Sequence, residues 1–174
     1  MGQWEASAGA SDEWYTPPYI FEALGETFDM DVAAPMLLPS WIGDRLNPTS
    51  PQGGRRWLWK DSLETDWAGF VWMNPPFGGR NSLAPWLKQF FDHGNGIALT
   101  PDRTSALWFR DAWERADLAL FMPKVRFIRP DGSVGKQPAN GTCLWASGNR
   151  AINALERAAS VGLGILAQPR KVAA

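Results

Sequence analysis

The stretch "GFVWMNPPFGGRNSLAPWLKQFFDHGNGIALT", Gly69 to Thr100, holds two short apolar runs separated by a helical repeat. The first run ends at Met73 and the second is "GIALT", and each has the length and composition of a buried strand. Between them, apolar side chains recur at the i, i+3, i+4, i+7, i+8 spacing of one helix face: Leu83, Trp86, Leu87, Phe90 and Phe91. Gly94 supplies the stop. A strand, helix, strand order predicts an α/β sheet whose strands are joined by crossover helices.

The same alternation extends in both directions from this stretch. Downstream, "TSALWFRDAWERA" predicts a helix and "DLALFM" a buried strand. Upstream, Thr16 is expected to cap a helix that Gly25 closes, and "TFDMDVAA" predicts a strand with Asp29 and Asp31 on its outer side. In the tail, "KVRFIR" and "GTCLWA" predict a β-hairpin, followed by a helix over 151–159 and a short strand in "VGLGILA". Residues 39–60 lack a clean period and predict a long irregular loop.

Composition limits the classes of function. The chain has 174 residues with 45% hydrophobic content, which predicts one domain over 11–174 after a flexible terminus over 1–10. A single cysteine and a single histidine exclude an internal disulfide and argue against a thiolate or histidine metal site, so no metal is expected. A net charge of −1 excludes a globally basic coat for nucleic acid. No leader and no membrane-length apolar run is found, which predicts a soluble cytoplasmic protein.

The residues after the first strand, "NPPF", suggest a binding loop. In open α/β sheets, ligands bind beyond the carboxyl ends of the strands, and Asn74 falls at that point. Pro75 and Pro76 fix the backbone and remove two N–H donors, so the loop offers mainly acceptors. The Asn74 side-chain oxygen and the Pro75 carbonyl are two such acceptors, and Phe77 adds a flat apolar face. Two acceptors beside a stacking plane match an amino group on a planar ring.

Such an amine, as on adenine N6, is a poor nucleophile because its lone pair is delocalised into the ring. If both of its N–H groups are bound out of the ring plane, the lone pair is freed to attack an electrophilic methyl group. The rate gain then comes from orientation and from oxygens facing the positive charge that develops on nitrogen. A base buried in a duplex has to swing out first, and Phe77 is the expected stacking partner.

The "NPPF" sequence resembles the catalytic motif of S-adenosylmethionine-dependent amino-methyltransferases. With its flanks, "DEWYTPPYIFEALG", "FDMDVAAP", "DSLETDWAGFVWMNPPFG" and "TPDRTSALWF", about two thirds of the chain resembles the phage-type (Dam-like) DNA N6-adenine methyltransferase family. The resemblance implies a Rossmann-like methyltransferase fold with a mixed, mostly parallel sheet, helices on both faces and the C-terminal hairpin. It also implies S-adenosyl-L-methionine as cofactor, adenine in duplex DNA as substrate, and catalysis by Asn74, Pro75, Pro76 and Phe77.

The resemblance implies cofactor contacts at three places, which comprise Trp14, Tyr15, Thr16 and Pro17; Asp31, Ala33 and Ala34; and Asp61. A carboxylate near a strand end suits the cofactor's ammonium group, and small neighbours allow close approach. The glycine-rich F-x-G-x-G that usually follows the first strand is replaced here by "DVAAP", a departure that bears on how the cofactor is gripped. Thr16 and Asp61 also fit ordinary helix starts, and Asp31 a helix cap, so these alternatives stay open.

DNA contacts are expected from a local excess of cations. The segment "KVRFIRPDGSVGK", 124–136, carries four cations against one carboxylate. The predicted DNA-binding residues are Arg80, Arg103, Lys124, Arg126 and Arg129. A solvated hairpin face is the alternative interpretation of the same charges.

Two other functions remain open at this stage. The same acceptor loop would serve a protein glutamine amide N-methyltransferase, or the chain could be a catalytically silent DNA-binding module of the same fold. The resemblance further implies DNA methylation in a restriction-modification setting, with a phage-encoded protein acting in its host cell as one possibility. Monomer and homodimer are both compatible with the sequence.

Overall fold

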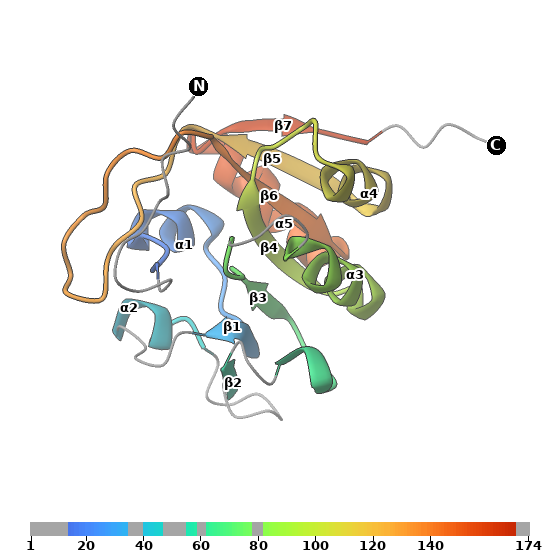
Figure 1. The fold of residues 1–174 in the computed structure, drawn as a ribbon, viewed down its shortest axis with the longest axis horizontal. Helices are drawn as coiled ribbons and strands as arrows, with labels where there is room; N and C mark the ends of the chain where they lie inside the picture. The colour runs from blue at the N-terminus through green and yellow to red at the C-terminus, as the bar shows by residue number, and fades with distance from the viewer. Residues whose placement is uncertain (1–13, 35–39, 47–54, 59–61, 78–81, 170–174) are drawn as a thin grey trace, which may run out of the picture.

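The computed structural model describes residues 14–34, 40–46, 55–58, 62–77 and 82–169. Within these ranges the strands form one seven-stranded sheet in the order β2-β1-β3-β4-β6-β5-β7 (Figure 1). Their bounds are β1 Met30–Ala34, β2 Arg55–Leu58, β3 Val71–Met73, β4 Gly96–Pro101, β5 Leu118–Met122, β6 Thr142–Ser147 and β7 Ile165–Ala167.

Helices cover both faces of this sheet, as an α/β fold requires. They are α1 Pro18–Leu24, α2 Ser40–Gly43, a 3₁₀ turn η1 Ser62–Glu64, α3 Leu83–His93, α4 Leu107–Arg115 and α5 Asn149–Ser160. One core cluster joins α1 and α5 to one face of the sheet, and a second joins α3 and α4 to the other. Figure 1 shows α3 and α4 in front of the strands and α5 behind them.

Strand β3 explains how the two clusters are separated. Val71 and Met73 point into the α3–α4 cluster, whereas Trp72 between them points into the α1–α5 cluster. All three are buried, because a strand covered on both faces carries apolar residues at every position. The apolar stripe of α3 predicted from the sequence is confirmed, and Gly94 ends the helix with a left-handed φ of 76°.

The sheet is mixed, and the prediction that it is mostly parallel is wrong. Among the described strands, β1–β2, β1–β3 and β3–β4 pair in parallel, while β4–β6, β5–β6 and β5–β7 pair antiparallel. Strands β6 and β7 run opposite to the other five: β6 lies between β4 and β5, and β7 pairs with the other edge of β5. A strand that returns through a loop instead of a crossover helix has to enter the sheet in the opposite direction.

The predicted C-terminal hairpin is wrong in its first strand. β6 pairs with β5, and residues 124–129 form no strand of the sheet. The alternation that suggested a strand is real, since Val125 and Phe127 are buried between exposed Lys124 and Arg126. It arises because one side of this extended segment packs against the α1–α5 cluster. Alternate side chains of any extended segment point to opposite sides, so this packing gives the same period of two as a strand in a sheet.

Two further sequence predictions need correction. Strand β1 was expected to alternate, yet all five of its residues are buried, Asp31 included. Asp29, just before it, is half-buried and accepts a hydrogen bond from the Phe70 backbone N–H at 2.7 Å. Region 39–60 was expected to be irregular but contains α2 and β2. The β2 sequence "RRWL" begins with two cations and has no apolar period. It is therefore recognised as a strand by its pairing with β1 and not by its composition.

A carboxylate ties α1 to α5. Glu26, after α1, accepts from Arg150 Nε at 2.9 Å and from an Arg157 nitrogen at 3.3 Å. Arg157 also donates to the Leu24 carbonyl, and the Arg150 guanidinium lies 4.3 Å from the centre of the Phe70 ring. The Glu26 side chain is only 14% exposed, so this small network is better shielded than an ordinary surface pair.

We therefore expect Glu26→Gln to lower the free energy of unfolding by about 1 kcal/mol, because two arginines lose their charged partner while helix contacts persist. Urea unfolding with circular dichroism measures this change. Glu156→Gln, an exposed site on α5, is the matched control and should have little effect. Equal losses in the two variants would mean that net charge, and not the network, is responsible.

Candidate functional site at the carboxyl ends of β1 and β3

The "NPPF" loop begins where β3 ends, at a point of the sheet suited to ligand binding. The chain passes from β1 outward to β2, then returns across β1 to form β3 on its other side. Strand order therefore reverses between β1 and β3, and ligands of open α/β sheets bind in the crevice at such a switch point. Asn74 and Pro76 are half-buried, Pro75 is buried, and Phe77 is 38% exposed. The amide and the ring thus lie at the surface end of a buried strand.

A hydrogen bond joins this loop to the N-terminal motif. The Asn74 Nδ2 donates to the Thr16 hydroxyl oxygen at 3.1 Å, across 58 positions of sequence. Thr16 is 1% exposed, so the contact is shielded from water. With its nitrogen donating to Thr16, the amide has its oxygen to offer to an incoming donor. The sequence placed both residues in one site, and here they are in contact.

The expected role of Thr16 as a helix cap is wrong. The residue at the N-cap of α1 is Pro17, with no side-chain capping bond, and Pro18 follows within the helix. Two prolines at the start of a helix have no backbone N–H groups, so fewer donors are available there for a capping hydroxyl. Its bond goes to Asn74 instead.

The carboxylate of Asp31 lies inside β1 and not at its end. It is 4% exposed, and one of its oxygens accepts from the Ala33 backbone N–H at 3.1 Å. Ala33 and Ala34, also buried, complete the strand at its carboxyl end. The chemistry of the set, a buried acid beside small residues, fits a ligand with an ammonium group.

Trp14 and Tyr15 connect the site to the basic segment 123–141. Tyr15 is buried, and its backbone exchanges two hydrogen bonds with Ile128, at 2.8 and 2.9 Å. The Arg129 guanidinium lies 5.6 Å from the centre of the Trp14 ring. In Figure 1 this segment, drawn in orange, extends away from the sheet past α1. The basic segment is therefore docked on the N-terminal motif.

A second aromatic contact links the segment directly to the acceptor loop. The rings of Phe77 and Phe127 meet edge to face, with centroids 6.1 Å apart. Phe127 is 9% exposed and belongs to the α1–α5 core. No role was assigned to Phe127 from the sequence. The alternation of Val125 and Phe127 with cations in the sequence was the signal from which burial of the Phe127 ring could have been predicted.

The predicted DNA-binding residues that the structure describes lie on two segments of the chain. Lys124, Arg126 and Arg103 are exposed, Arg129 is half-buried against Trp14, and Arg103 belongs to the turn after β4. Arg80, predicted to grip phosphate, and Asp61, predicted to contact the cofactor, lie outside the described residues.

The one histidine and the one cysteine of the chain make contacts that suit a structural role. His93 Nε2 lies 2.8 Å from the Gly69 carbonyl oxygen. Cys143 is buried, which raises the pKa of its thiol, and the nearby Asp102 adds to the rise. Within the described ranges, no group of three or more His, Cys, Asp or Glu side chains could hold a metal ion.

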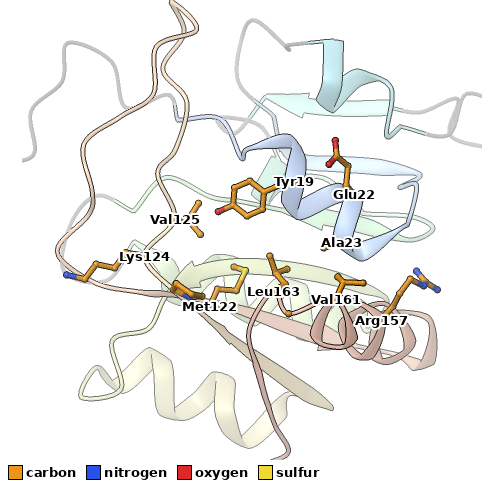
Figure 2. Close-up of a pocket in the computed structure, with 11 residues that line it drawn as sticks. Tyr19, Glu22, Ala23, Met122, Lys124, Val125, Arg157, Val161 and Leu163 are labelled. Atoms are coloured by element: carbon orange, nitrogen blue, oxygen red, sulfur yellow. The ribbon is translucent and has the colours of Figure 1, made fainter.

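A cavity of about 610 Å³ lies away from the acceptor loop (Figure 2). It is bounded by α1, the end of β5 and the turn after α5, and none of Asn74, Pro75, Phe77 or Asp31 lines it. Tyr19 extends from α1 toward Val125, whereas the ammonium of Lys124 points away from the cavity. Burial raises the pKa of Tyr19. The two cations that line the cavity, Lys124 and Arg157, do not point toward a common position. The cavity therefore has no arrangement of charges that would bind a particular ligand.

The chain matches no protein-family model, no curated protein and no solved structure. In the part of the chain that the structure describes, no helix has the length and apolar character needed to cross a membrane.

Proposed function

We propose that this protein transfers a methyl group from S-adenosyl-L-methionine to the N6 amine of adenine in DNA. The observation that carries the proposal is the hydrogen bond between Asn74 and Thr16 at the β1–β3 switch point. It joins the acceptor loop to the N-terminal motif and orients the amide so that its oxygen can accept from an amino group.

The chemistry assigned to the loop needs orientation more than proton abstraction. The Asn74 oxygen and the Pro75 carbonyl accept the two N–H groups of the target amine, and the amine keeps its lone pair for the attack. As positive charge develops on the nitrogen, the same oxygens stabilise it, and because they are already in place, little reorganisation is needed. Phe77 is half open to solvent and provides the face on which a swung-out adenine stacks.

The cofactor is assigned to the carboxyl ends of β1 and β3, beside this loop. Asp31 would hold its ammonium group, Ala33 and Ala34 allow close approach, and Trp14 to Pro17 border the methionine end. When bound, the cofactor would supply the electrophilic methyl group: its methyl–sulfur bond would break as the new carbon–nitrogen bond forms, S-adenosylhomocysteine would leave, and the proton lost by the amine would pass to solvent. The chain's own part is to hold the amine in line with that group and to keep water from the acceptors.

Charge favours DNA over a protein amide as the substrate. Segment 123–141, docked against Tyr15, carries Lys124, Arg126, Arg129 and Lys136 with Asp131 as its one acid. A polyanion gains from such a segment through release of its counterions, and a neutral glutamine side chain does not. A silent DNA-binding module would share these charges but would have no use for an oriented amide at the switch point.

One experiment tests the proposal directly. Purified protein is incubated with unmethylated duplex DNA and methyl-labelled cofactor, and the modified base is mapped by sequencing. We expect label on adenine N6. Cofactor binding by calorimetry, run in parallel, separates the alternatives: binding without label on any DNA favours the protein amide, and DNA binding without cofactor binding favours the silent module.

Phe77→Ala should act mainly on substrate binding. Loss of a stacking face costs about 1–3 kcal/mol per base, so we expect KM for DNA to rise by roughly 5- to 150-fold with a smaller change in kcat. Steady-state kinetics on a short duplex measures both constants. Leu63→Ala removes a similarly exposed apolar side chain from η1 and serves as the control. An unchanged KM would remove Phe77 from the base-binding role.

A further inference from the structure

The middle of the basic segment forms a short two-stranded ribbon, here called the finger, Phe127–Gly135. The Gly135 N–H donates to the Phe127 carbonyl at 2.8 Å, and the Arg129 N–H donates to the Ser133 carbonyl at 2.9 Å. Ile128 and Val134 form an antiparallel bridge between these bonds. The finger is therefore a small hairpin that stands outside the main sheet.

The tip of the finger is ordered by its own hydrogen bonds. Gly132 has a φ of 82° and donates to the Arg129 carbonyl at 2.9 Å. The Asp131 carboxylate accepts from the Ser133 N–H at 2.8 Å, and hydrogen bonds from Ser133 lower the pKa of that carboxyl. All residues from Pro130 to Val134 are exposed, with Val134 at 60%. A preformed, solvent-facing tip loses little conformational entropy when it binds a partner.

The base of the finger is held at a set position relative to Asn74. Tyr15 pairs with Ile128 through two backbone hydrogen bonds, and Phe127 contacts Phe77. Trp14 packs so closely on Gly135 that a Cβ there would lie 2.6 Å from its ring. Tyr15 precedes Thr16, which bonds Asn74, and Phe77 belongs to the acceptor loop, so the base of the finger is anchored beside that loop.

Most charged residues in the finger and at its base are positive. Lys124, Arg126 and Lys136 are exposed at its base, Arg129 stacks on Trp14, and Asp131 is the one acid between 124 and 136. The segment thus has three more positive than negative charges in a chain whose net charge is −1. Positive charge gathered beside an exposed ribbon is what phosphate groups on both sides of a DNA groove would attract.

We propose that the finger enters the major groove of DNA and that its tip reads the base pairs next to the target adenine. This inference rests on the function proposed above. The major groove admits a two-stranded ribbon and presents a distinct pattern for each base pair. The Asp131 carboxylate can accept from the exocyclic amine of cytosine, and the Val134 side chain can contact the methyl group of thymine. The cations at the base of the finger contact phosphates and supply affinity without sequence preference.

The test compares tip and base variants on one substrate pool. Duplexes with a single adenine in random flanking sequence are bound, and separately methylated, by wild type, Asp131→Asn, Val134→Ala and Arg126→Gln. We expect each tip variant to change preference at a flanking position by about tenfold. Arg126→Gln should instead weaken binding to all sequences alike and reduce the slope of log affinity against log salt by about one.

The outcomes separate this inference from the proposed function. Identical flank profiles for wild type and both tip variants, with DNA binding or methylation intact, would overturn the finger as a reader and leave the function standing. A wild-type protein that binds DNA with flank preference but transfers no methyl group would contradict the function, and the binding profiles would still test the finger. Because all three substituted side chains are exposed, thermal unfolding of every variant should match wild type, which would exclude misfolding as the cause.

Discussion

Replacement of Asn74 by alanine should reduce methyl transfer by about 10²–10³-fold while cofactor affinity stays within about twofold of wild type. The amide oxygen is assigned to the developing charge on the substrate nitrogen, so its loss raises the barrier of the chemical step. Single-turnover rates with saturating DNA, and calorimetry with the cofactor alone, measure the two quantities separately.

Thr16 provides the matched variant for this prediction. Thr16→Val keeps the buried shape but removes the oxygen that accepts from Asn74 Nδ2, so the amide loses its orientation and not its chemistry. We expect a loss of about fivefold, with recovery in Thr16→Ser, since one neutral hydrogen bond contributes about 1 kcal/mol. If Asn74→Ala abolishes cofactor binding as well as transfer, the residue belongs to the cofactor's site and the assignment of the acceptor loop is wrong.

Trp145→Ala should cause the largest loss of stability, about 3–5 kcal/mol of the free energy of unfolding. The side chain is fully buried in β6, and its partners across the sheet are Ala98 and Ala119, whose small size makes room for the indole ring. Its Nε1 donates to the Thr100 hydroxyl at 2.8 Å, and its ring meets Phe109 edge to face. The truncation removes these contacts and leaves a cavity between the sheet and α4.

Two substitutions calibrate this loss. Trp145→Phe keeps most of the ring and removes the bond to Thr100, so about 1–2 kcal/mol should be lost. Trp113→Ala, at a half-buried tryptophan on α4, should cost less than Trp145→Ala because its site is open to solvent on one side. Urea denaturation with a constant m-value measures all three. A loss at Trp145 no greater than that at Trp113 would show that the sheet relaxes around the cavity.

Much of the fold could be predicted from the local pattern of apolar residues and glycines. The helices α1, α3, α4 and α5 and the strands β3, β4 and β5 each carry a period or a closing glycine that marks them in one short stretch, and they were predicted. Strand β2 was missed because its residues have no apolar period. The partner of β6 was wrong because alternation in residues 124–129 reports burial of one side and says nothing of which backbone lies alongside.

The candidate site shows the same division. The residue types of the acceptor loop, and their place after a strand, follow from the sequence, because proline and asparagine act on the backbone and on donors within a few positions. The sequence did not reveal the Phe77–Phe127 contact or the docking of Tyr15 on Ile128. These pairs are far apart in the chain, and nothing in either stretch encodes the other.

By itself, then, the sequence determined which segments are helices and strands in most of the chain, and which side chains could accept an amine, since both depend on local periodicity and chemistry. Only the tertiary structure decided that the Thr16 hydroxyl serves Asn74 and does not cap α1, and that the basic segment is a finger anchored beside the acceptor loop. Such choices are made by packing between distant segments, where a donor takes whichever acceptor the folded chain brings within reach.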